Sequence, residues 1–195
     1  NMYEEWENYK DMDNEGFTVF ESGRGYLYAN NNTFSPTFTG VLNATEVTYP
    51  LIYVQRPESE SSGFNLIGNP FPHVIYKGNG GAIDNANLAS GYYTLTNEGV
   101  WHVHTYEEAI QPGQGILVKT SEALDLTIAK SNAAANAETS DAKQRMGRMN
   151  ISVSGESGED RAYAYFCKGT GLDKMSNFNE QTPSLWISDN GNKYA

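Results

Sequence analysis

Apolar and polar residues alternate, or form short apolar runs, along most of the chain from Phe17 onward. This period of two is typical of β-strands, because successive side chains of a strand point to opposite faces of the sheet. Glycine, asparagine and proline separate the runs and predict turns. We expect about eight strands in these segments: 17–22, 25–30, 37–43, 49–55, 63–72, 92–106, 108–120 and 124–130. The pattern predicts an all-β fold, an antiparallel β-sandwich or jelly roll.

The pattern changes twice. The first sixteen residues are acidic and aromatic and predict a loop or a short helix, since Tyr3, Trp6 and Tyr9 recur at a spacing of three. Residues 131–147 lack aromatic and β-branched apolar residues and predict a linker. We therefore expect a β-sandwich domain over 1–130 and a shorter β segment over 148–195, with strands at 148–155, 160–168 and 184–190. That segment is either the start of a second domain or a set of strands that pack on the first.

Several turn motifs carry residues with specific conformational roles. In GFNLIGNPFP, we expect Asn65 and Asn69 to bond loop backbone at an interior corner. In QPGQG, Pro112 and Gly113 fit the centre of a type II turn. Residues 92–106 predict a hairpin around Asn97-Glu98-Gly99.

Composition excludes several classes of protein. The chain has 195 residues, with 13 Lys and Arg against 24 Asp and Glu, which gives a net charge of −11. This acidity argues against nucleic acid as a partner, because phosphate binding depends on clustered Lys and Arg. No apolar run is long enough to span a bilayer. Cys167 is the only cysteine, so an intrachain disulfide is impossible. The start at Asn1, without a signal peptide, suggests a piece of a longer protein.

Two histidines offer the sharpest enzymatic hypothesis. His102 and His104 lie two residues apart on an expected strand, so both imidazoles share one face and Glu108 follows. The run matches the first metal motif of cupins, which are jelly rolls. The cupin glycine is replaced by Thr96, and His73 is the only other histidine. The alternative is a pair of surface histidines on a hairpin, and we expect no cofactor.

Motifs for calcium binding or for other enzymatic chemistry are incomplete or missing in the sequence. The run DMDNEG, with Asp11, Asp13 and Glu15, resembles the front of a calcium loop, but its twelfth position is Ser22 instead of glutamate. Asp173 and Asn177 offer oxygen ligands without a clear loop. Nucleophile-elbow, P-loop and dinucleotide-binding motifs are missing. We therefore expect that the chain is not an enzyme.

Aromatic residues are more numerous than a core strictly needs. Tyrosine and tryptophan faces stack on sugar rings or anchor protein partners. Candidate ligand-binding residues are Trp101, Tyr92, Tyr93 and Tyr106, and Trp186 and Tyr194 are further aromatics of this kind. The alternative is that most of these rings fill the core of the sandwich.

Four ordered segments carry a resemblance: GRGYLYAN, FTGVLN, GFNLIGNPFP and IQPGQGILVK. Together they resemble a β-sandwich module of large secreted and cell-surface proteins of Bacteroidetes, usually found upstream of a C-terminal sorting domain. The later runs RMNISVSG, DRAYAYF, GLDKMSNFN and PSLWISDNGNKYA resemble the module that follows it there. The resemblance implies a secreted or cell-surface, adhesin-like module without catalysis, for adhesion, ligand binding or structural spacing.

The resemblance also bears on partners. It implies a glycan or a host or bacterial surface protein as the ligand, and a carbohydrate-binding module is the first alternative function. The cupin-like metal enzyme is the second. Since an unfinished sheet exposes strand edges, we also expect the final segment to pack on the first domain or to associate with a second molecule.

Overall fold

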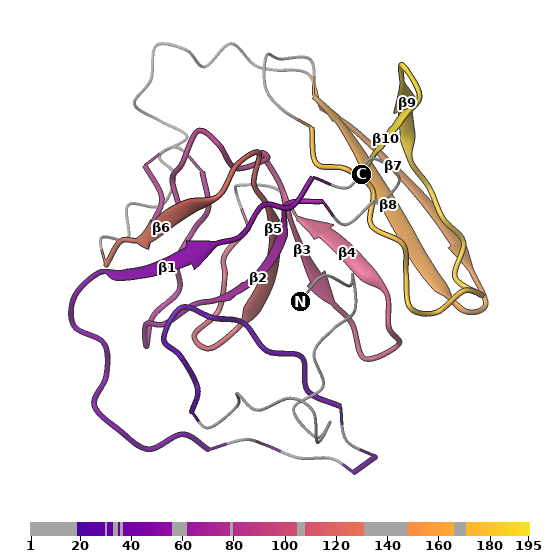
Figure 1. Ribbon diagram of the computed structural model, residues 1–195. Helices are drawn as coiled ribbons and strands as arrows, with labels where there is room; N and C mark the ends of the chain where they lie inside the picture. Colours follow the sequence, from indigo (N-terminus) through magenta and orange to yellow (C-terminus); the bar gives the residue numbers. More distant parts are fainter. Residues whose placement is uncertain are drawn as a thin grey trace.

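The computed structural model describes residues 19–29, 31–32, 35, 37–55, 62–78, 80–104, 108–130, 148–165 and 171–195. In these residues the chain is all-β: they contain no helix, and their strands form several small antiparallel sheets without a closed barrel (Figure 1). The strands are β1 (Val47–Leu51), β2 (Phe64–Gly68), β3 (Tyr92–Leu95), β4 (Trp101–His104), β5 (Gly115–Lys119), β6 (Leu124–Ile128), β7 (Arg148–Gly155), β8 (Gly158–Tyr165), β9 (Ile187–Asp189) and β10 (Asn192–Tyr194). The expected fold class is confirmed. The same residues contain no helix that is long and apolar enough to cross a bilayer.

The largest sheet has four strands in the order β2-β5-β3-β4. Its antiparallel ladders set Ile67 opposite Ile116, and Tyr93 opposite both Val103 and Leu117. Opposite residues of antiparallel strands point to the same face, so this register sorts the side chains into two sets. Residues of both sets are buried, which means that both faces of the sheet are covered.

One face of this sheet packs against a ribbon made by β1 and β6, which pair antiparallel over five residues each. The shared cluster contains Leu51, Leu126 and Ile128 from the ribbon and Ile67, Tyr92, Ile116 and Val118 from the sheet. Burial of each such side chain contributes about 1.5–3 kcal/mol, so this cluster is a main source of stability for the fold.

The opposite face of the sheet packs against chain that follows residue 170. Tyr93, Trp101, Val103 and Leu117 share a cluster with Leu172 and Ala195. Backbone groups add to the contact: the Tyr93 hydroxyl donates to the Asp173 carbonyl at 2.8 Å, and the Phe178 N–H donates to the Gly99 carbonyl at 2.9 Å. The C-terminal segment therefore lies directly on the sheet formed by the first 130 residues (Figure 1).

A buried ion pair attaches β8 to the same segment. The Lys174 ammonium lies 2.6 Å from both carboxylate oxygens of Asp160, and the two side chains are 5% and 1% exposed. The carboxylate also accepts hydrogen bonds from the Leu185 N–H at 2.6 Å and from the Arg161 N–H at 2.9 Å. These four contacts compensate the free-energy cost of removing the Asp160 carboxylate from water. A carboxylate buried without partners would have no such compensation.

The expected turn chemistry is confirmed at two corners. Asn69 is buried and its amide donates to the carbonyls of His73, Ile110 and Gln111, while its oxygen accepts from the Phe71 N–H. The Gln114 N–H donates to the Gln111 carbonyl across the turn, and Gly113 has φ of 69°. A positive φ at the third residue is the requirement of a type II turn, which explains glycine after proline.

The expected strands over 17–22, 25–30 and 37–43 are wrong, because their described parts form no strand. An isolated bridge between Arg24 and Ile67 lies just outside these ranges. Val41 is 100% exposed, and Phe20 and Phe38 are also exposed. Strand propensity reflects packing on a half-buried surface more than a preference of the backbone. These segments have the composition of strands, but most of their side chains have no such surface. The expected helix or loop over 1–16 and the linker over 131–147 lie outside the described residues.

Candidate functional site

His102 and His104 lie on β4 and share one face, as their spacing predicted, while Trp101 and Val103 point into the core. The His104 ring bonds through Nδ1 to Glu108 Oε2 at 2.8 Å and through Nε2 to Thr94 Oγ1 at 2.7 Å. It also stacks on Tyr92 with the ring planes 12° apart. Both ring nitrogens therefore already have protein partners.

The metal hypothesis gains no support from this arrangement. Within the described ranges, no group of three or more histidine, cysteine, aspartate or glutamate side chains is placed to hold a metal ion. Burial lowers the pKa of His102 below its ordinary value, and the positive charge of Arg161 acts in the same direction. Both histidines are partly buried on one face of the sheet.

Three of the four aromatic candidates are core residues, as the alternative interpretation expected, and this corrects their assignment as ligand-binding residues. Tyr92, Tyr93 and Trp101 are at most 1% exposed. Tyr93 and Trp101 lie under the C-terminal segment, whose backbone and Asn177 side chain they contact. A ring face covered by protein has no room for a sugar, so these residues build the fold. Tyr106 lies outside the described residues.

Two calcium candidates are also occupied by structural contacts. Asp173 forms an ion pair with Lys119 of β5. The Asn177 side-chain oxygen accepts a hydrogen bond from the Trp101 N–H at 2.8 Å. Both side chains attach the C-terminal segment to the sheet. Asp11, Asp13 and Glu15 lie outside the described residues.

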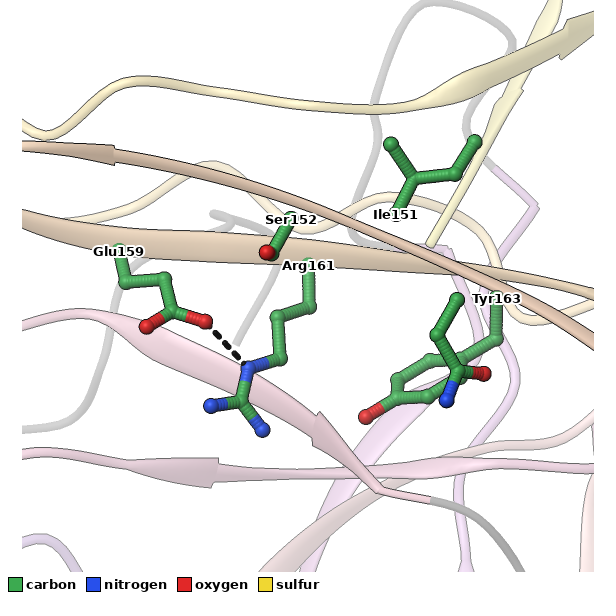
Figure 2. Close-up of a pocket in the computed structure, with 6 residues that line it drawn as sticks. Ile151, Ser152, Glu159, Arg161 and Tyr163 are labelled. Carbon is green, nitrogen blue, oxygen red and sulfur yellow. Dashed lines mark hydrogen bonds and ion pairs between the residues drawn. The ribbon is translucent and has the colours of Figure 1, made fainter.

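The β7–β8 hairpin contains an open pocket that no sequence motif predicted. Its volume is about 230 Å³, and it is lined by Asn150, Ile151, Ser152, Glu159, Arg161 and Tyr163. The ladder sets Asn150 opposite Tyr163 and Ser152 opposite Arg161. Because opposite residues share a face, the pairing gathers polar side chains from two strands on one side of the hairpin. Figure 2 shows the Glu159, Arg161 and Tyr163 side chains extending in a common direction from β8.

Arg161 and Glu159 form the charged part of this pocket. Arg161 Nε donates to Glu159 Oε1 at 2.6 Å, with side chains that are 50% and 37% exposed (Figure 2). This hydrogen bond lowers the pKa of Glu159 and raises the pKa of Arg161, so both groups stay charged at neutral pH. Asn150 and Ser152 make no side-chain hydrogen bond to another described residue. The pocket therefore offers donors and acceptors to a ligand.

Sequence reasoning missed this site because its members are spread over two ordinary strands. RMNISVSG and the following strand were both expected, but neither contains a motif. The available indication was the two-residue turn Glu156-Ser157, which fixes the pairing of Gly155 with Gly158 and therefore the whole ladder. Comparison with protein families, curated proteins and solved structures finds no significant match to this chain.

Proposed function

We propose that this chain is a non-catalytic binding module of an extracellular bacterial protein, and that the β7–β8 pocket receives one sugar unit of a glycan. The observation that carries the proposal is the lining of the pocket. Five of its six residues have side chains that can form hydrogen bonds: Asn150, Ser152, Glu159, Arg161 and Tyr163.

The chemistry of these side chains matches a polyol. Sugar hydroxyls both donate and accept, and here arginine donates, the carboxylate accepts, and the amide and hydroxyl groups do both. The Tyr163 ring adds an apolar surface of the kind on which sugar C–H groups pack. The pocket of about 230 Å³ is smaller than the roughly 300 Å³ or more that larger ligands occupy. Its size fits one small polar unit better than an extended cofactor.

The extracellular assignment rests on the resemblance of the ordered segments to modules of secreted and surface proteins of Bacteroidetes. Such modules serve adhesion, ligand binding or structural spacing. The proposed glycan site lies on the exposed hairpin instead of at Trp101 and the neighbouring tyrosines. Membership of this group and location at the cell surface are part of the proposal.

A glycan array with the wild-type chain, followed by NMR titration of each hit, tests this function. We expect Arg161→Ala to weaken binding by about tenfold or more, since hydrogen bonds from charged groups contribute about 1.5–3 kcal/mol. Arg24→Ala is the matched control, because it removes another exposed arginine from an ion pair with a glutamate, Arg24 with Glu21 at 3.4 Å. A wild-type chain that binds no glycan, or an Arg161→Ala variant that binds as well as wild type, contradicts the proposal.

A further inference from the structure

The outer edge of β7 has no ladder partner among the described residues. β7 pairs with β8 along all eight of its residues, and the ladder runs without a bulge from Arg148 and Tyr165 to Gly155 and Gly158. Unpaired N–H and C=O groups of an edge strand form a template for another strand. Natural edges often block such pairing with lysine, proline or a bulge, and β7, with the sequence RMNISVSG, has none of these.

The side chains of β7 separate by face. Met149 and Ile151 are 47% and 37% exposed, and Val153 follows on the same face by alternation. Asn150, Ser152 and Ser154 are exposed on the other face, where the pocket lies. The alternation of apolar and polar residues is the same in both directions along the strand, so an antiparallel copy of β7 presents a matching pattern.

We propose that two copies of this chain pair antiparallel through β7, around a two-fold axis at Ser152. This register sets Ile151 opposite Val153 of the second copy and Asn150 opposite Ser154 of the second copy. Apolar residues then meet apolar residues, and polar residues meet polar ones. A shift by one position would place apolar side chains opposite polar ones, because each single step in register exchanges the faces.

Charge favours the same register. The whole chain has a net charge of −11, which opposes association of two copies through most surfaces. Residues 149–155 of β7 carry no charge, so self-pairing there brings no like charges opposite each other. With Ser152 on the axis, position 148, an arginine, lies opposite position 156 of the second copy, a glutamate. By symmetry, the sequence places an arginine opposite a glutamate at both ends of the new ladder.

The resulting sheet has four strands in the order β8-β7-β7-β8. Because the two-fold axis is perpendicular to the sheet, both pockets open on one face. A dimer of this kind binds a repetitive ligand through two sites, which raises its apparent affinity without new contacts. The pairing itself does not depend on the glycan proposal, because it concerns backbone groups of β7 and is measured without ligand.

Light scattering after size exclusion tests the pairing. We expect the wild-type chain to have twice its chain mass of 21.5 kDa. Ile151→Lys places like charges near the axis, and we expect it to weaken the dimer by about tenfold or more. Ile52→Lys is the matched control at an exposed isoleucine outside the hairpin, and it keeps the wild-type mass. A wild-type chain that remains a monomer at millimolar concentration overturns the proposal.

Cysteine cross-linking tests the register. Both variants are made with Cys167→Ser, since Cys167 is the only native cysteine. Ser152→Cys sets two cysteines directly opposite, with Cα atoms about 4.5–5.5 Å apart, and we expect a disulfide-linked dimer on oxidation. In Ser154→Cys the two cysteines lie about 13 Å apart along the ladder, which is too far for a disulfide. Cross-linking of Ser154→Cys, or its failure in Ser152→Cys, contradicts this register.

Discussion

The four-stranded sheet and the β7–β8 hairpin use polar side chains in opposite ways. In and around the sheet, Asn69 and Lys77 are buried and bonded to backbone carbonyls, and His104 has partners on both ring nitrogens. On the hairpin, Ser152 and Arg161 are exposed beside an open pocket. The polar side chains in and around the sheet therefore hold the fold together through their hydrogen bonds. Those of the hairpin are exposed to solvent and accessible to a ligand.

The largest expected effect comes from the sheet. Trp101→Ala removes a side chain that is buried between the sheet and the C-terminal segment. We expect the free energy of unfolding to fall by about 3–5 kcal/mol, as for other large-to-small core changes. Urea unfolding followed by far-UV circular dichroism measures it. A loss below about 1 kcal/mol would mean that Trp101 is not a core residue.

Lys174→Met tests how strongly the hairpin is attached. It leaves the Asp160 carboxylate buried without its cation. We expect a loss of about 3 kcal/mol or more in the free energy of unfolding at pH 7, because an uncompensated buried charge is costly.

The double variant Asp160→Asn with Lys174→Met removes both charges and is the control for this prediction. It should lose less stability than Lys174→Met alone. Equal losses in the single and double variants would indicate that the ion pair itself contributes little.

Lys77 makes the free energy of unfolding depend on pH in the alkaline range. Its ammonium is buried against the Ala89 carbonyl, and burial lowers its pKa from 10.5 to about 8. Between these values the unfolded chain holds more protons than the folded chain, so stability rises with pH, by about 3 kcal/mol in total. We expect Lys77→Met to lose this rise.

Denaturant titrations at pH 7.5 and pH 10 measure the difference between wild type and Lys77→Met. At neutral pH we expect the variant to be at least as stable as wild type, since no charge must be buried. Lys130→Met, at an exposed lysine, is the control and keeps the wild-type dependence. The same pH dependence in Lys77→Met as in wild type would contradict the assignment to Lys77.

The smallest stability effect is expected on the hairpin, where the largest effect on binding is proposed. Arg161→Ala breaks an exposed ion pair with Glu159, and such pairs contribute about 0–1 kcal/mol. The free energy of unfolding should change by less than about 1 kcal/mol. A larger loss in thermal or urea unfolding would give Arg161 a structural role like those of the buried residues in the sheet.

Some features followed from the sequence alone. Alternation predicted the strands from residue 63 to 130 and the hairpin of β3 and β4, and the Pro112-Gly113 turn followed from local conformational rules. The strand expected over 184–190 contains β9, but its partner β10 was missed. The available indication was the dipeptide Asn190-Gly191, which favours a tight two-residue turn and has positive φ at both residues. The segments 17–22, 25–30 and 37–43 had the composition of strands, but their described parts form none.

The sequence by itself determined the all-β class and most turns, because both depend on residues close together in the chain. Only the tertiary structure decided which aromatic rings are covered, which polar groups line a pocket and which strand keeps an unpaired edge. Tyr93, for example, is enclosed by contacts that include Asp173, 80 residues away. Burial depends on which faces meet across such distances, and a period of two gives the faces of a strand without naming what lies against them.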